Sequence, residues 1–177
     1  MSPQPISNPH NPDLPYFECH RHGLEFFDSA EVRFQYEMLL DTTPERLFEI
    51  FEDEKSWTVW APGIREVIWT TPKPYGVGTK RTVIFQGGME VYEEFIAWDR
   101  GKEMAFIFEG ITQPIWWSFG EHYRVEPSAS GKVKLTWTVA YNPRHRFAKL
   151  SPFLKPAMWL TLRSFTKRLE KYCRQHG

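Results

Sequence analysis

The chain lacks long apolar runs. None of its 177 residues lie in a stretch close to the roughly 20 apolar residues that a membrane-spanning helix needs. Cysteine is also scarce, since only Cys19 and Cys173 occur, near opposite ends. No segment has the pattern of a signal peptide, so we interpret both as free thiols and predict a protein of the cytoplasm.

Sequence patterns of common catalytic sites are missing as well. The segment from Gly76 to Lys80 lacks the two glycines, four residues apart, of a phosphate-binding loop. His122 falls on a predicted outer strand face, where no Ser or Cys completes a triad. Cys19 to His22 holds three metal-ligand side chains, but a zinc site takes four at recurring spacings. We therefore expect no metal and no cofactor.

Net charge is zero, with 22 basic and 22 acidic residues, but the charge is unevenly spread. Residues 142–177 hold nine Lys and Arg residues against one acidic residue, Glu170. One interpretation is a helix with a solvated outer face that complements an acidic sheet. The other is peripheral contact with an anionic membrane, which attracts basic amphipathic helices. Nucleic acid is not an expected partner, because aromatic residues occupy apolar faces, away from this basic end.

What the chain has in excess is aromatic rings. They make up 16% of the residues, including 8 Trp and 14 Phe. Large rigid rings fill volume at low entropic cost, so this richness fits either a large core or a ring-lined pocket. The length favours one domain, at residues 31–177. Residues 1–30 begin Pro-rich and form a predicted extension, partly disordered, whose Phe17, Phe26 and Phe27 pack on that domain.

Alternating apolar and polar residues predict a sheet. The first strand runs from Val32 to Leu40, and six more are expected near 64–70, 79–86, 89–98, 103–109, 116–125 and 132–141. Short turns join most of them, so neighbouring strands are antiparallel. Two short helices follow the first strand, around Pro44 and around Trp57. A long amphipathic helix ends the chain, and we expect its regular part to start near Pro156.

Three segments in fixed order carry a family resemblance: residues 75–81, 93–99 and 135–139, followed by the long helix. This order resembles the START-like (SRPBCC) helix-grip superfamily, in particular its polyketide cyclase/dehydrase and lipid-transport branch. The resemblance covers roughly residues 30 to 173. It implies an α+β, Bet v 1-like fold with a seven-stranded curved antiparallel sheet. Two short helices follow its first strand, and a long C-terminal helix over the concave face encloses an apolar cavity.

Strand alternation places charged residues among apolar ones. Glu121 shares a strand face with Phe119 and Tyr123, and an unpaired buried carboxylate is costly or has a raised pKa. Glu121 therefore pairs with a cation such as Arg81, lies at a wet cavity mouth, or serves a ligand as anchor or general base. Arg81 could equally be an ordinary surface cation.

Alternation leaves open which of Glu93 and Glu94 faces inward, and we assign Glu94. The predicted cavity, of at least a few hundred cubic ångströms, is lined by twelve residues: Arg81, Phe85, Glu94, Phe108, Trp117, Phe119, Glu121, Tyr123, Trp137, Met158, Leu162 and Phe165.

Three functions fit these observations. The first is binding, transport or sequestration of a small hydrophobic molecule, such as a lipid or polyketide-like metabolite. The second is a cyclase/dehydrase-type enzyme that acts on a hydrophobic substrate in the same cavity. The third is a non-catalytic interaction protein whose cavity is filled core. The resemblance supplies no catalytic motif, so no catalytic residue is assigned, and the oligomeric state is left open.

Overall fold

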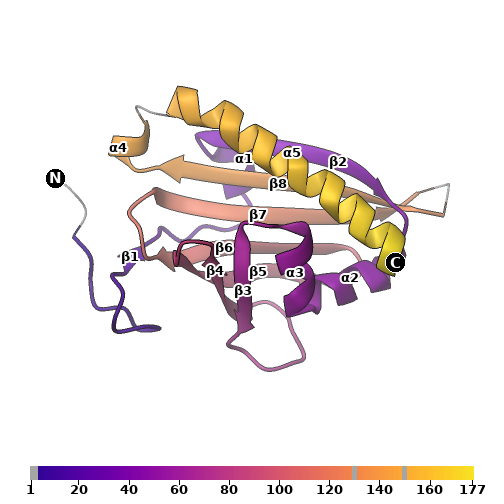
Figure 1. The fold of residues 1–177 in the computed structure, drawn as a ribbon, viewed down its shortest axis with the longest axis horizontal. Helices are drawn as coiled ribbons and strands as arrows, with labels where there is room; N and C mark the ends of the chain where they lie inside the picture. The colour runs from indigo at the N-terminus through magenta and orange to yellow at the C-terminus, as the bar shows by residue number, and fades with distance from the viewer. Residues whose placement is uncertain (1–3, 129–130, 149–150) are drawn as a thin grey trace.

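A curved antiparallel sheet forms the body of the protein. The computed structural model describes residues 4–128, 131–148 and 151–177, and within them seven strands run in the order β2-β8-β7-β6-β5-β4-β3. Figure 1 shows the sheet beneath one long helix. The strands are β2 (Val32–Leu40), β3 (Ile64–Trp69), β4 (Lys80–Phe85), β5 (Glu90–Asp99), β6 (Glu103–Ile111), β7 (Trp116–Pro127) and β8 (Val133–Pro143).

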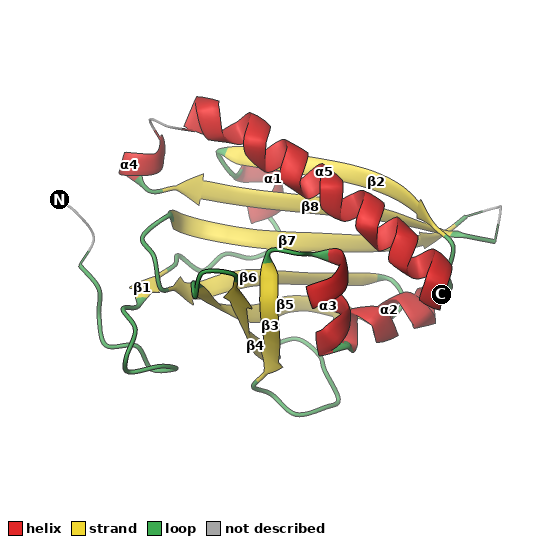
Figure 2. Ribbon diagram, viewed as in Figure 1, coloured by secondary structure: helices red, strands yellow, loops and turns green. Residues whose placement is uncertain are grey.

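Two short helices follow β2, at α2 (Pro44–Glu52) and α3 (Glu54–Trp60). Thr43 begins the first, since its hydroxyl accepts a hydrogen bond from the Arg46 amide at 3.2 Å. Asp53 begins the second by accepting from the Lys55 amide at 3.0 Å. These caps turn the chain twice, so both helices lie at one end of the sheet (Figure 2).

The long helix α5 (Ser151–His176) crosses the sheet and packs mainly on β2 and α3. Leu162, Leu169 and Cys173 face the core and are buried. Pro156 lies inside the helix, so our expectation that the regular part starts near this proline was wrong. A proline removes a single backbone donor, and within the first two turns of a long helix that loss is tolerated. A short helix, α4 (His145–Ala148), precedes it.

The predicted α+β helix-grip fold is confirmed. Strand bounds differ from the predicted ones by no more than two residues. Short elements that alternation did not predict, β1 (Phe17–Glu18) and α1 (Phe26–Ser29), lie in the N-terminal extension. β1 adds to β6 beside the main strand order.

The N-terminal extension covers the convex face of the sheet. Phe26 and Phe27 are buried as expected, and they form a second small core with Ala97, Ala105 and Ala140. Nearer the N-terminus, Asn8 is 5% exposed and donates a hydrogen bond from Nδ2 to the Tyr92 hydroxyl at 2.8 Å.

Close approach of the extension depends on a glycine. The Tyr16 ring lies over Gly110, where a Cβ atom would come within 2.2 Å of it. The role of the extension therefore includes covering apolar sheet surface.

Candidate functional site

An internal cavity of about 230 Å³ lies between the concave face of the sheet, α3 and α5; we call it the inner cavity. It is smaller than the few hundred cubic ångströms we expected. The reason is the size of the rings that face inward, because Trp57 and Trp60 are 3% and 2% exposed and occupy space beside α5. A neighbouring hollow of about 330 Å³ shares Trp116, Met158 and Thr161 with it.

An ion pair lies on the wall of the inner cavity. Arg81 Nε and Glu93 Oε2 are 2.5 Å apart, and both side chains are almost completely buried. The two residues face each other directly across β4 and β5. Burial raises the pKa of Glu93, while the charge and hydrogen bond of Arg81 oppose that rise. Of the alternatives left open for Glu121, an ion pair with Arg81 is not the one found, because the adjacent strand supplies Glu93 as the partner of Arg81.

Aromatic rings surround the Arg81 guanidinium. Its central carbon lies 4.2 Å from the ring centre of Trp57 and 4.8 Å from that of Phe106. Trp69 and Phe95 complete the set at 5.3 and 5.1 Å. Cation–π contact stabilises a charge that has been removed from water. The enclosure fixes the guanidinium in one position at the cavity wall.

Glu121 forms a second polar group on the same wall. Its Oε2 accepts hydrogen bonds from the Tyr123 hydroxyl and from Trp137 Nε1, the latter at 2.9 Å. Burial raises the pKa of Glu121 to about 7, with a further contribution from the negative charge of Glu93. The two hydrogen bonds counteract the rise. The carboxyl is thus able to exchange a proton near neutral pH.

Two buried donors on the cavity wall have no protein acceptor. Arg81 Nη1 and Trp60 Nε1 make no hydrogen bond to any described residue. Buried polar groups are normally paired, because leaving one unpaired costs roughly 1–3 kcal/mol. Both donors belong to residues that line a largely apolar cavity, which suits this cavity to a molecule that brings an acceptor.

Most of the residues predicted to line the cavity do line it. They come from β4, β6, β7, β8 and α5, and they are Arg81, Phe85, Phe108, Phe119, Glu121, Tyr123, Trp137, Met158, Leu162 and Phe165. Their contact with a ligand stays a prediction.

Glu94 does not line the cavity. It lies on the opposite sheet face, where Arg21 Nη2 approaches Oε1 at 2.5 Å and Lys80 Nζ approaches Oε2 at 3.3 Å. Glu93 points inward instead. Glu93 shares the inner face with Val91 and Phe95, and Ile96 is an extra residue between Phe95 and Ala97 that breaks the alternation linking Glu94 to Trp98.

Trp117 does not line the cavity either. A bulge between Trp116 and Ser118 in the pairing of β7 with β8 sends Trp116 inward and Trp117 outward. Strict alternation places Trp117 on the same face as Phe119. The sequence cannot reveal the bulge, because Trp116 and Trp117 are both tryptophan and either could face inward.

Other lining residues were missed by the sequence interpretation. They lie mainly on α3, its following loop and the central strands: Trp57, Trp60, Ala61, Gly63, Ile64, Val83, Met89, Glu93, Phe106, Trp116 and Thr161. The spacing of Trp57 and Trp60, three residues apart on a helix, was an available signal that both rings face one side.

The inner cavity offers no cluster of metal ligands. Throughout the described ranges, no group of three or more His, Cys, Asp or Glu side chains has an arrangement that holds a metal ion. Its polar groups include the Arg81–Glu93 ion pair, the Glu121 carboxyl with its two hydrogen-bond donors, and the unpaired donors Arg81 Nη1 and Trp60 Nε1. Such a set binds and orients an acceptor and exchanges a proton with it.

A curved antiparallel sheet, a helix lying across it and an apolar cavity between them define the helix-grip class of proteins. The sequence comparison is more specific. Residues 31–174 match the family described as "Polyketide cyclase / dehydrase and lipid transport", and the chain belongs to this family. The resemblance noted in the sequence is therefore confirmed.

The chain is also similar to a curated relative in sequence and to solved structures in fold. The chain is 37% identical over 156 residues to uncharacterized protein Rv2574 of Mycobacterium tuberculosis (strain ATCC 25618 / H37Rv), covering 88% of this chain and 93% of the relative. A START superfamily protein from Mycobacterium smegmatis superposes with a TM-score of 0.67 at 12% identity, over 81% of this chain and 97% of that one. The Zhui aromatase/cyclase from Streptomyces sp. R1128 gives 0.67 at 9% identity, over 81% and 94%.

Proposed function

We propose that the protein binds a small hydrophobic molecule that carries a hydrogen-bond acceptor in the inner cavity. The observation that carries this proposal is the pair of buried donors without a protein acceptor, Arg81 Nη1 and Trp60 Nε1, on residues that line a largely apolar cavity. A carbonyl, enol or carboxylate oxygen of a ligand pairs with them, while its hydrocarbon part contacts the rings. The family, described by lipid transport and polyketide cyclisation, supports the same class of ligand.

A matched ligand pair tests this proposal. Acetophenone and ethylbenzene have nearly the same shape, but only the ketone carries an acceptor. We expect acetophenone to bind about tenfold more tightly in a titration followed by tryptophan fluorescence. Leu162→Trp, which fills the cavity from α5, should abolish binding of both. Val59→Trp, at a residue 57% exposed on α3, is the control and should change neither. Binding of neither compound to the wild-type protein would refute the proposal.

A cyclase/dehydrase-type enzyme is the second candidate, and Glu121 favours it. A carboxyl with a pKa of about 7, bonded to the Tyr123 hydroxyl, suits general acid–base chemistry next to a bound carbonyl. Deuterium incorporation into the acetophenone methyl group, followed by NMR in heavy water, separates the two candidates. An enzyme exchanges faster with wild-type protein than with Glu121→Gln, whereas a binding protein leaves the rate in buffer unchanged with both. The third interpretation, a filled core, is disfavoured by the cavity.

Peripheral contact with an anionic membrane is also proposed, through the N-terminal half of α5. Phe153 and Leu160 are 79% and 61% exposed there, and Arg163 lies 5.0 Å from the ring centre of Trp159. Exposed apolar side chains beside basic ones are typical of interfacial helices. The hollow that adjoins the inner cavity opens beside the same half of α5. Within the described residues, no helix is long and apolar enough to cross a bilayer.

Vesicle binding tests the membrane proposal. We expect Phe153→Ser combined with Leu160→Ser to reduce cosedimentation with phosphatidylserine-containing vesicles by about tenfold or more, because two apolar anchors are lost. Val77→Ser, at a loop residue 70% exposed, is the control and should bind like the wild type. Equal binding to vesicles of neutral lipid would contradict a role for the basic residues.

A cytoplasmic location stays a prediction. Cys19 and Cys173 are free thiols in the structure, and both are buried. Burial raises the pKa of each thiol to about 12, so neither is reactive near neutral pH. Unreactive free thiols are compatible with a reducing compartment.

A further inference from the structure

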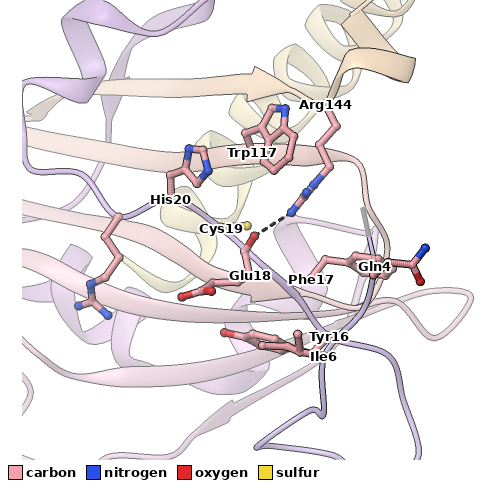
Figure 3. Close-up of a pocket in the computed structure, with 10 residues that line it drawn as sticks. Gln4, Ile6, Tyr16, Phe17, Glu18, Cys19, His20, Trp117 and Arg144 are labelled. Carbon is pink, nitrogen blue, oxygen red and sulfur yellow. Dashed lines mark hydrogen bonds between the residues drawn. The ribbon is translucent and has the colours of Figure 1, made fainter. Parts of the chain in front are cut away.

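A second pocket, of about 600 Å³, lies on the convex side of the sheet, away from the inner cavity; we call it the outer pocket. The N-terminal extension forms one wall with Gln4, Ile6 and Phe17, and the start of β7 forms another with Trp117. Figure 3 shows Arg144 reaching across the pocket toward the backbone of Glu18. None of these residues lines the inner cavity.

Arg144 is an unusual residue for such a surface. It is only 5% exposed, and its guanidinium carbon lies 3.9 Å from the ring centre of Trp117. Nε donates to the Trp116 carbonyl at 3.0 Å, and Nη2 donates to the Glu18 carbonyl at 2.7 Å. These bonds hold the side chain in one position across the pocket.

The positive charge of Arg144 has no carboxylate partner. No ion pair joins it to an acidic side chain in residues 4–128, 131–148 or 151–177. Burial lowers the pKa of Arg144, the direction expected of a cation removed from water without compensation. A guanidinium has five N–H donors, and the two bonds to carbonyls leave donors for another acceptor.

The other charged residues that line the outer pocket leave the Arg144 guanidinium free to bind an anion. Arg21, which also lines the pocket, is already paired with Glu94 and Glu109 at 2.5 and 2.9 Å. Glu18 is the acidic side chain among the lining residues, and in Figure 3 its carboxylate points away from the guanidinium. Apolar groups of Ile6, Phe17 and Trp117 line the space beside Arg144.

We propose that the outer pocket is a second binding site, specific for a small organic carboxylate with an apolar body. The planar guanidinium of Arg144 pairs with the carboxylate in a forked contact, which is the geometry that arginine favours. The hydrocarbon part lies against Ile6 and Phe17. A fixed, desolvated cation gains more from an arriving anion than an exposed one does, because water screens it less. This site is independent of the function proposed for the inner cavity.

Octanoate and octanamide test the outer pocket, since they differ in charge but hardly in shape. Binding is followed through the indole N–H signal of Trp117 in two-dimensional NMR spectra, assigned with Trp117→Phe. We expect octanoate to bind about tenfold more tightly than octanamide. Arg144→Gln should abolish the preference. Glu18→Gln, a surface change that keeps the fold, should tighten octanoate binding by about twofold because a nearby negative charge is lost.

Controls separate this site from the inner cavity and from loss of folding. Met158→Trp obstructs the inner cavity and should leave the octanoate shifts of Trp117 unchanged. If Arg144→Gln does not fold, two measurements still test the proposal. They are the affinity of the wild type for octanamide relative to octanoate, and the affinity of Glu18→Gln for octanoate. Equal affinity for octanoate and octanamide overturns the proposal. So do octanoate shifts confined to Trp137, which lines the inner cavity, and an octanoate affinity unchanged or weakened by Glu18→Gln.

Discussion

Replacing Glu93 with Gln is expected to lower the free energy of unfolding by about 3–5 kcal/mol. The substitution removes the negative partner of Arg81, whose side chain is 1% exposed, and leaves the guanidinium buried without a counter-charge. The aromatic rings around Arg81 compensate for only part of the loss of water. Urea denaturation at neutral pH, followed by circular dichroism, measures the change.

The neighbouring residues provide a matched control. Lys80 and Glu94 face each other across the same two strands, one residue along from Arg81 and Glu93, but they point to the exposed side of the sheet. Glu94→Gln should cost clearly less, about 1 kcal/mol, because its partners Arg21 and Lys80 are 57% and 42% exposed and stay in contact with water. The double variant Arg81→Met with Glu93→Leu should recover most of the stability. Equal losses for Glu93→Gln and Glu94→Gln would show that burial is not the cause.

Replacing Glu121 with Gln is expected to stabilise the protein, increasingly so as the pH rises. The pKa of Glu121 is about 7 in the folded protein, against an ordinary value of 4.5. Between these values the folded state binds more protons than the unfolded state, so the wild type loses stability as the pH rises. Gln carries no such titration. The difference in unfolding free energy should therefore approach about 3 kcal/mol at full ionisation.

The pH series itself is the measurement. Urea denaturation of wild type and Glu121→Gln between about pH 4 and pH 8 should show nearly equal stabilities at the acidic end and divergence above it. Because Glu93 is present in both proteins, the difference reports the titration of Glu121 together with its coupling to Glu93. A constant difference for Glu121→Gln would mean that the carboxyl keeps an ordinary pKa.

Sequence patterns predicted the positions of the helices and strands well. They predicted less well which side chains of each strand point to the inner face of the sheet. Strand β2 alternates cleanly between Val32 and Leu40, so its ends and its buried face were both predictable. Alternation also placed Glu121 on the inner face, but it left the facing of Arg81 open. It failed at Glu94 and Trp117, because a bulge adds one residue to a strand without leaving a distinctive sequence. Only the register of the paired strands in the structure shows where the alternation of inward and outward residues shifts.

The Arg81–Glu93 pair was unpredictable for a related reason. Its formation depends on the register of β4 against β5, which joins Arg81 to Glu93 and Lys80 to Glu94. Both glutamates precede the same apolar residue, Phe95, and either assignment gives a plausible strand. The enclosing rings also come from distant segments, with Trp57 on α3 and Phe106 on β6. The outer pocket could not be predicted at all, since it joins residue 4 to residue 144.

The bulge at the start of β7 has a consequence for how this protein can change over evolutionary time. Trp116 lies opposite Pro143 and Ser118 lies opposite Asn142, so Trp117 is the extra residue between them. Loss of that one codon leaves a regular strand in which Trp116 and Phe119 still face inward. The ring that supports Arg144 would disappear while the inner wall stayed in place. A deletion of this single residue would therefore alter one wall of the convex-side pocket while leaving the same side chains of the strand facing the inner cavity.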